Sequence, residues 1–355
     1  RRGGNRMRVL VICGGESSEH SVSLVTTKAV LESIDAEHEV ILVGITPEGK
    51  HILLPEVGDW KLSDSPVLED NDLEILWPFG GGELAYFEYR ELIPIGEIDV
   101  CLPLLHGDNG EDGSIQGLLQ LCHIPYVGNG VSASAVAMDK QLTKNLARQA
   151  GIPVCDELVV DHNQFLDNPE QTIHSLDNQL TYPVVIKPAK SGSSVGVSVA
   201  ENSNQLLESL KLAFEQDNRV LIEPRLIGRE IEIAVLEDLG GELITSVAGE
   251  IVVGGGGIYD YQAKYLTDAA KLTVPAELSD EQLGTAQDLA KTAFKALGCS
   301  GLARVDFFLT DNGWMLSEVN TMPGFTPISM YPKLFKESGI DYPELIAKLI
   351  ERAIR

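Results

Sequence analysis

The chain has 355 residues, which suggests two or three domains, and 44% of them are hydrophobic, which is enough for a sizeable buried core. The formal net charge of −26 argues against nucleic-acid binding, because that function needs a basic surface. No apolar run approaches the roughly 20 residues that cross a bilayer. The five cysteines are scattered and form no CxxC pair, so we expect a reduced, cytoplasmic protein without a disulfide framework or a zinc site.

Short strands and helices alternate along the first third of the chain. The predicted strands are 8–13, 40–46 and 99–105, and the predicted helices are 17–33 and 115–122. This rhythm is typical of a parallel sheet covered by helices. Residues 50–95 show no comparable order and predict a loop-rich insertion.

Two segments beside these strands carry polar residues suited to a ligand site. Glu19 lies at the mouth of the first strand-to-helix turn, where its carboxylate could meet an ammonium group or simply be stabilised by the helix dipole. His106 begins a glycine-rich stretch, 106–117, at the carboxyl end of a strand, where open α/β sheets place ligands. A capped helix start is the plainer interpretation of that stretch, and the two are compatible.

The middle of the chain predicts a continuous helix followed by a small sheet. The helix is expected over 132–149, with strands at 157–161, 184–187, 196–200 and 220–224 and a further helix at 203–216. Between two of these strands lies the segment 187–196, rich in glycine and serine. Its backbone N–H groups can converge on a phosphate, and Lys187 adds a positive charge, although an ordinary turn is the alternative.

Two further glycine-containing segments give weaker signals. Residues 44–50 approach a Walker A pattern, but His51 stands where Ser or Thr must hold a metal ion, so we expect a tight turn. The four glycines at 254–257 are expected to hinge the loop 260–265, which mixes tyrosines with charges as substrate-closing loops do. Packing of those tyrosines on the surface is the alternative.

Residues 304–320 predict a β-hairpin with a metal-binding face, after strands at 231–237 and 243–251 and a helix at 279–297. A three-residue loop with Gly313 in the left-handed conformation would pair Asp306 with Glu318, and Arg304 with Asn320. Paired residues project on the same face, and carboxylate and amide oxygens suit Mg²⁺. A solvated polar face is the alternative, and a two-residue loop would break this register.

Together these segments resemble the D-alanine–D-alanine ligase family of ATP-grasp enzymes, from Met7 to the end of the chain. The motifs that carry the resemblance are 14–23, 106–117, 138–140, 187–196, 260–265, 304–306 and 318–326. The resemblance implies a mixed α/β (α+β) ATP-grasp fold of three domains. These are an N-terminal parallel α/β domain, 1–139, and two α+β domains that sandwich ATP, 140–225 and 226–355.

The resemblance also implies the reaction. ATP phosphorylates the carboxylate of one D-alanine, and the amine of a second D-alanine attacks the acyl phosphate, which gives D-alanyl-D-alanine for peptidoglycan synthesis. Two Mg²⁺ ions, for which Mn²⁺ is a possible substitute, are implied as cofactors. D-alanine and ATP are the implied small-molecule substrates, and a homodimer without nucleic-acid or membrane partners is the implied assembly.

Residue roles follow from the resemblance, position by position. The implied metal ligands are Asp306, Glu318 and Asn320. The implied ATP-binding residues are Lys140, Lys187, Ser191, Ser194, Val195, Glu223 and Glu230. The implied catalytic residues are Glu19, Ser193, Tyr265, Arg304 and Gly324, and the implied substrate-binding residues are His106, Lys264, Ser329 and Met330. Pro224 stands where some members have lysine, and Met330 stands where many have leucine.

Other functions stay open at this stage. The same chemistry could take D-lactate or D-serine as the second substrate, although the pair Lys264-Tyr265 resembles the D-alanine type. Another ATP-grasp enzyme would share the hairpin and the phosphate loop but would not need Glu19 with the 106–113 motif. A nucleotide-binding sensor that has lost catalysis would not need the metal ligands together with Arg304.

Overall fold

The computed structural model describes residues 6–192, 194–253 and 270–355. Three of the predicted site residues, Ser193, Lys264 and Tyr265, therefore lie outside the described residues. The predicted glycine hinge at 254–257 and the loop 260–265 also lie outside them.

The N-terminal sheet has the strand order β3-β2-β1-β7, with β1, β2 and β7 parallel and β3 antiparallel at the edge. These strands are β1 (Arg8–Gly14), β2 (Glu39–Ile45), β3 (His51–Leu53) and β7 (Val100–Pro103). Alternate residues of β1 pack on opposite faces, so α1 (His20–Leu31) covers the face with Val9 and Val11, and α2 (Ser114–Leu121) covers the face with Leu10 and Ile12. The segment 44–50 is the predicted tight turn between β2 and β3, closed by a bond from Thr46 N to Lys50 O of 2.9 Å.

The expected loop-rich insertion at 50–95 was wrong, because this segment contains a second small sheet. Its antiparallel strands are β4 (Ile75–Leu76), β5 (Leu84–Glu88) and β6 (Glu91–Gly96), after a short 3-10 helix η1 (Leu62–Asp64). The strands β5 and β6 are joined by Tyr89 and Arg90, which both have positive φ, at 47° and 71°. Such a turn is normally marked by Asn-Gly, and neither residue occurs here, which explains why the sequence pattern concealed the hairpin.

The continuous helix expected at 132–149 was also wrong. The chain forms α3 (Val131–Met138) and α4 (Lys140–Gln149), and the break falls at Asp139, whose backbone is extended. The Asp139 carboxylate accepts bonds from the N–H groups of Gln141 and Leu142, both 3.1 Å, and pairs with Arg219. Asp139 is thus an N-cap in the middle of an apparently continuous helical pattern.

The central sheet is antiparallel, in the order β10-β9-β11-β8. Its strands are β8 (Leu158–Asp161), β9 (Val184–Pro188), β10 (Ser198–Ala200) and β11 (Arg219–Pro224), and its helices are α5 (His162–Asp167), α6 (Pro169–Asp177) and α7 (Ser203–Phe214). Val184 and Ile186 face the hydrophobic core with these helices, whereas Val185 and Lys187 face away from it into a cleft. The sequence had not predicted α5 and α6.

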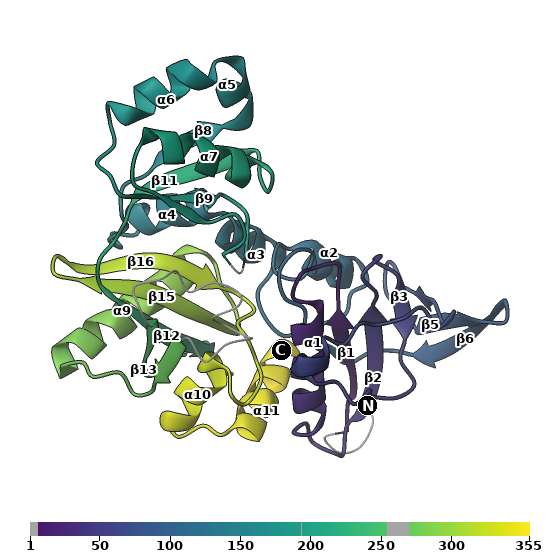
Figure 1. Ribbon diagram of the computed structural model, residues 1–355. Coiled ribbons are helices and arrows are strands. Elements are labelled where there is room, and N and C mark those ends of the chain that lie inside the picture. The colour runs from purple at the N-terminus through teal and green to yellow at the C-terminus, as the bar shows by residue number, and fades with distance from the viewer. Residues whose placement is uncertain (1–5, 193, 254–269) are drawn as a thin grey trace.

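The C-terminal sheet is antiparallel, in the order β14-β13-β12-β15-β16. Its strands are β12 (Arg229–Glu237), β13 (Leu243–Val253), β14 (Ala270–Thr273), β15 (Leu302–Thr310) and β16 (Gly313–Asn320). One face packs on α9 (Asp280–Ala296), and part of the other packs on α10 (Met330–Glu337) and α11 (Tyr342–Ala353). The core under α11 is continuous with that under α1, so the end of the chain returns to the N-terminal sheet (Figure 1).

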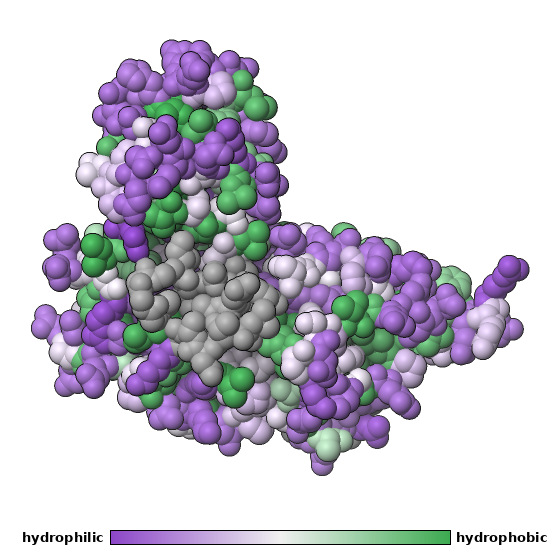
Figure 2. Space-filling model, in the orientation of Figure 1, coloured by the Kyte–Doolittle hydropathy of each residue, from purple (hydrophilic) through white to green (hydrophobic). Residues whose placement is uncertain are grey.

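Figure 1 shows the N-terminal, central and C-terminal sheets as separate lobes, with the central sheet above the C-terminal one and the N-terminal sheet beside the C-terminal one. Domain limits after residues 139 and 225 stay a prediction. The visible face of the molecule is largely hydrophilic, as its net charge requires (Figure 2). Among the helices of the described residues, none has the length and apolar character needed to cross a membrane.

Candidate active site

A cleft of about 730 Å³ separates the cleft-facing side of the central sheet from the C-terminal sheet. Both sheets line it with charged side chains. From the central sheet come Lys187 and Glu223, and from the C-terminal sheet come Arg304, Asp306 and Glu318. The structure therefore brings the predicted phosphate-binding and metal-binding groups into one space.

The predicted pairing of the metal hairpin is correct, but for a different reason. Thr310 pairs with Gly313, so the turn has two residues and not three. A β-bulge follows, and it leaves Phe307 opposite Leu316 but Asp306 opposite Glu318. The extra residue in β16, Ser317, thereby restores the register that the shorter turn would have broken.

The bulge also changes which face of β16 meets the cleft. Trp314 and Leu316 are buried in the core beneath α9. After Ser317, Glu318 and Asn320 lie on the opposite side and line pockets, while Val319 turns into the core. Without the extra residue in its place, strict alternation would carry Glu318 into the hydrophobic core with Leu316.

Arg304 organises the carboxylates of this face. Its Nε donates to Asp306 Oδ1 at 2.8 Å, its Nη2 donates to Asp306 Oδ2 at 2.7 Å, and Nε lies 3.1 Å from Glu232 Oε2. Burial lowers the pKa of Arg304, but Asp306 and Glu232 outweigh burial and raise it well above its usual value. Arg304 therefore remains charged and holds Asp306 in a fixed orientation.

The donor set of this face fits a hard divalent cation. Asn320 Nδ2 donates to Asp306 Oδ2 at 2.9 Å, so the amide and both carboxylates of the predicted set lie in one neighbourhood. Within the described residues, no group of three or more His, Cys, Asp or Glu side chains could hold a metal ion. The candidate set is instead two carboxylates, Asp306 and Glu318, with one amide oxygen, and such oxygen ligands suit Mg²⁺ together with substrate phosphates.

On the opposite wall, the carboxylate of Glu223 accepts hydrogen bonds from Lys187 in the cleft and from Lys144 behind it. Glu223 Oε2 accepts from Lys187 at 2.7 Å, and Oε1 accepts from Lys144 at 2.7 Å. Burial raises the pKa of Glu223, but the two lysines outweigh this and lower it to about 2. Burial lowers the pKa of Lys187, and Glu223 more than offsets that, so the net shift is upward.

Sequence reasoning had assigned no role to Lys144. It follows Lys140 by one helical turn, in the middle of α4. The sequence carries no signal for its partner, because the predicted helix 132–149 places Lys144 in a helix interior, where lysine is common. The structure supplies that partner in Glu223.

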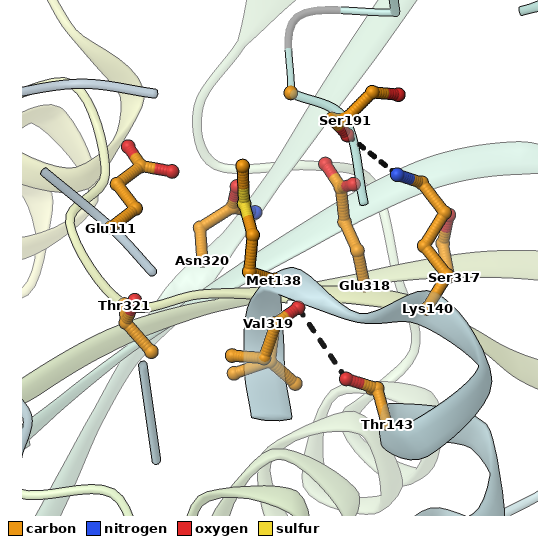
Figure 3. A pocket seen from close by; sticks show the side chains of 12 residues that line it. Glu111, Met138, Lys140, Thr143, Ser191, Ser317, Glu318, Val319, Asn320 and Thr321 are labelled. Atoms are coloured by element: carbon orange, nitrogen blue, oxygen red, sulfur yellow. Dashed lines mark hydrogen bonds between the residues drawn. The ribbon is translucent and has the colours of Figure 1, made fainter. Parts of the chain in front are cut away.

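Lys140 joins the start of α4 to the predicted phosphate loop (Figure 3). Its Nζ donates to Ser191 O at 2.6 Å, and its backbone N donates to Ala189 O at 2.9 Å. Burial lowers the pKa of Lys140. Ser191 and Ser194 line the cleft, whereas Val195 is 39% exposed and does not.

The predicted substrate residues of the N-terminal lobe meet the other two lobes. Glu19 is buried, and its Oε2 would lie 3.9 Å from a Cβ built on Gly192 of the phosphate loop. His106 is buried, with Nδ1 3.3 Å from Met322 O and 3.7 Å from Glu111 Oε1. Burial lowers the pKa of His106, but Glu111 and Glu19 outweigh it, so the net shift is upward.

A small pocket of about 40 Å³ lies where these lobes meet. Figure 3 shows Glu111 on one side of it, with Asn320, Glu318 and Lys140 on the other. Glu111 belongs to the 106–117 motif, but sequence reasoning gave it no role. Its place between His106 and the metal hairpin marks it as part of the site.

The predicted second-substrate residues lie at the start of α10. Ser329 precedes the helix, and its Oγ accepts from Thr326 N at 3.1 Å and would contact a Cβ on Gly324 at 3.2 Å. Gly324 and Ser329 are therefore close together. The Met330 side chain is 5% exposed and packs on Gly249, which places it in the hydrophobic core.

The last predicted nucleotide-binding residue, Glu230, lies on β12. Glu230, which pairs with Ile251 and Phe308 in the sheet, lines the cleft on the C-terminal side.

Family models match most of the chain. The model described as the D-ala D-ala ligase N-terminus matches residues 8–129, and the one described as the D-ala D-ala ligase C-terminus matches residues 146–351. The chain belongs to the D-alanine–D-alanine ligase family.

Relatives in this ligase family align over nearly their whole length. The D-alanine–D-alanine ligase of Mycolicibacterium smegmatis is 44% identical, with 98% of this chain and 96% of the relative covered. That of Acetivibrio thermocellus is 43% identical, with 99% and 97% covered. The predicted family and enzyme class are thus confirmed.

Solved structures of ligases match the fold. The D-alanine–D-alanine ligase of Coxiella burnetii superposes with a TM-score of 0.81 at 32% identity, covering 99% of this chain and 94% of that one. The VanG D-Ala:D-Ser ligase of Enterococcus faecalis gives a TM-score of 0.83 at 34% identity, covering 98% and 100%. The predicted mixed α/β ATP-grasp fold is confirmed, whereas the individual residue roles stay predictions.

Proposed function

We propose that this chain joins two D-alanine molecules into D-alanyl-D-alanine for peptidoglycan synthesis, with ATP as the phosphoryl donor and an acyl phosphate as the intermediate. The observation that carries the proposal is the cleft itself. Lysines on one wall face carboxylates on the other, as a triphosphate with divalent cations requires. Because the chain belongs to this ligase family, ATP is the implied phosphoryl donor.

The nucleotide is held by the central wall and the phosphate loop. Lys140 and Lys187 contact its phosphates, and the loop residues Ser191, Ser194 and Val195 fold over them. Glu223 and Glu230 bind the adenine and ribose sides. The support is that Lys140, Lys187, Glu223 and Glu230 line one cleft.

Asp306, Glu318 and Asn320 would hold two Mg²⁺ ions, or Mn²⁺ in their place. Such ions neutralise phosphate charge and orient the transferred group. The remaining catalytic work falls to residues of the chain. Arg304 stabilises the oxyanion of the tetrahedral intermediate together with the backbone N–H of Gly324, and one such donor often contributes about 3–4 kcal/mol to catalysis.

The two D-alanine molecules bind where the lobes meet. Glu19 takes the ammonium group of the first, with His106 nearby, and Ser329 with the backbone at Met330 takes the carboxylate of the second. Ser193 and Tyr265 would hydrogen-bond across the site and hold it closed, and Lys264 would bind substrate; all three lie outside the described residues. The support is the burial of Glu19 beside the phosphate loop and the contact distance between Gly324 and Ser329.

The second substrate decides between this function and its nearest alternatives. The relatives at 43% and 44% identity are named D-alanine–D-alanine ligases, whereas the D-Ala:D-Ser ligase is 34% identical. This difference favours D-alanine over D-serine. A sensor without catalysis would have no use for Arg304 fixed on Asp306.

We also propose a cytoplasmic homodimer. All five cysteines are free thiols, which suits a reducing compartment. Light scattering of the purified chain would measure the assembly, and a monomer at micromolar concentration would contradict it.

The function is tested by phosphate release from Mg-ATP with D-alanine as the sole amino acid, with the product identified by mass. D-serine and D-lactate are then added in competition. Release matched one-to-one with D-alanyl-D-alanine is the expected result. A mixed product would favour a rival ligase, and ATP binding without D-alanine-dependent release would favour the sensor.

A further inference from the structure

Helix α4 carries a buried lysine that has no role in the chemistry above. Lys144 is 2% exposed and does not line the cleft. Its Nζ lies 2.7 Å from Glu223 Oε1, 3.1 Å from Glu157 Oε2 and 3.2 Å from Cys155 Sγ. An ammonium group has three donors, so each donor of Lys144 has an acceptor and none is left for a ligand.

Glu223 stands between this buried lysine and the cleft. Its second carboxylate oxygen accepts from Lys187 at 2.7 Å, and Lys187 lines the cleft. Lys144 is therefore behind the carboxylate, and Lys187 is in front of it.

The charges of the cluster leave one positive charge in excess. Glu157 pairs with Arg148 as well as with Lys144, so three cations share two carboxylates. Without Lys144 the same cluster would be neutral. Of the two lysine contacts of Glu223 described above, only the one with the Lys187 ammonium would then remain.

We propose that Lys144 is a positioning residue that neutralises Glu223 from behind, so that the charge of Lys187 remains available to the phosphates of the nucleotide. The inference rests on the proposed function only in assuming that the cleft binds ATP. A buried carboxylate with a single cationic partner holds that partner tightly, because the interior screens charge poorly. With two partners, Glu223 keeps its orientation when Lys187 turns toward a phosphate.

The first test is the binding of Mg-ATP to the full chain by calorimetry, without D-alanine. Lys144→Met should raise the dissociation constant by about tenfold or more, since Glu223 would then hold the Lys187 ammonium and the phosphates would lose its charge. The KM for D-alanine should stay unchanged, because the substrate residues lie elsewhere. Lys144→Arg should retain most of the affinity, since the charge is kept.

A matched control removes a lysine that has no contact with the cleft. Lys211 lies on the outer face of α7 in an exposed pair with Glu208 at 2.9 Å. Lys211→Met should bind Mg-ATP like the wild type. Thermal unfolding of each variant shows whether the fold is kept.

The second test is a double-mutant cycle with Glu223→Gln, which removes the charge that Lys144 is proposed to neutralise. In that background Lys144→Met should change the dissociation constant by less than about threefold. Should Lys144→Met alone fail to fold, Glu223→Gln and the double variant still supply this comparison, because the double variant buries no unpaired Glu223 carboxylate.

Three results would overturn the proposal. The first is a folded Lys144→Met variant that binds Mg-ATP with wild-type affinity. The second is that Lys144→Met weakens Mg-ATP binding equally with Glu223 and with Gln at position 223. The third is that Lys144→Met also raises the KM for D-alanine. A wild-type chain that binds ATP without ligase activity would refute the proposed function alone. A chain that binds no ATP would refute both.

Discussion

The central sheet and the C-terminal sheet line the same cleft with different charges. The central wall presents Lys140 and Lys187, and the carboxylate of Glu223 is bonded to Lys187 in the cleft and to Lys144 behind it. The C-terminal wall presents Asp306 and Glu318, and Arg304 is bonded to Asp306. One wall thus suits phosphates and the other suits metal ions, and on each wall a group of opposite sign orients one of these residues.

The two walls also differ in how that orienting group is placed. Glu223 is held from both sides, by Lys187 in the cleft and Lys144 behind it. Arg304 contacts Asp306 and Glu232 on its own face of the sheet. On both walls, a charged side chain that lines the cleft is oriented by a neighbouring side chain of opposite charge. Substitutions on each wall can test this.

The largest effect is expected from Asp306→Asn on the C-terminal wall. This substitution keeps the shape but removes one of the two carboxylates proposed to bind metal ions, so phosphate release should fall about 1,000-fold, at the upper end for one electrostatic group. Steady-state kinetics of Mg-ATP turnover would measure it. Asp311→Asn, in the exposed turn of the same hairpin, is the control and should leave turnover unchanged. Equal activity in both variants would remove Asp306 from the metal site.

Arg304→Lys should have the next largest effect. Lysine keeps the charge but cannot make both hydrogen bonds to Asp306, so turnover should fall roughly 100-fold. Arg352→Lys, in the α11 pair with Glu237 at 2.9 Å, is a matched change away from the cleft. Turnover in Arg304→Lys that equals turnover in Arg352→Lys would show that the charge alone suffices.

The central wall should show its charge pairing as a dependence of stability on pH. The pKa of Glu223 is lowered from 4.5 to about 2, so its pairing contributes fully above pH 4.5 and is lost as the pH falls toward 2. The free energy of unfolding in urea should lose on the order of 2–3 kcal/mol more in the wild type than in Glu223→Gln across that range. Parallel pH profiles of the two proteins would contradict the pairing.

The smallest effect concerns the support behind the C-terminal wall. A Cβ at Gly249 would lie 2.6 Å from Met330 Sδ and 3.0 Å from Leu334 Cδ2, so Gly249→Ala should destabilise the fold by about 1–2 kcal/mol. Gly284→Ala should instead stabilise it by about 0.5–1 kcal/mol, because that glycine lies inside α9 with nothing within 4 Å of a new Cβ. Chemical unfolding would give both values, and the same sign for both would refute the packing argument.

Local patterns predicted most of the strands and the pairing of Asp306 with Glu318, because alternation and turn residues are written in the sequence. The turn itself was wrong, since Ser317 shifts the register at a point that no propensity marks. The break at Asp139 was missed because a cap and an internal polar residue look alike within a helical pattern.

Contacts between distant segments were harder to predict. Lys144 is held by Glu223, which is 79 residues away in the sequence, and no local pattern marks that contact. The side chain of Met330 packs against Gly249 of another strand, a contact that the sequence did not predict. Such positions depend on how separate elements dock, which a local pattern does not encode.

The bulge in β16 has a consequence for engineering this hairpin. Because the register of Glu318 and Asn320 is set at Ser317, a β-bulge separates the cleft-facing half of the strand from the tip of the hairpin. Asp311 and Asn312 at that tip are exposed, so a short reporter peptide inserted between them should leave the ligands in place. If the insertion variant retains turnover, a reporter at the hairpin tip can be used to study the cleft without altering the residues that line it.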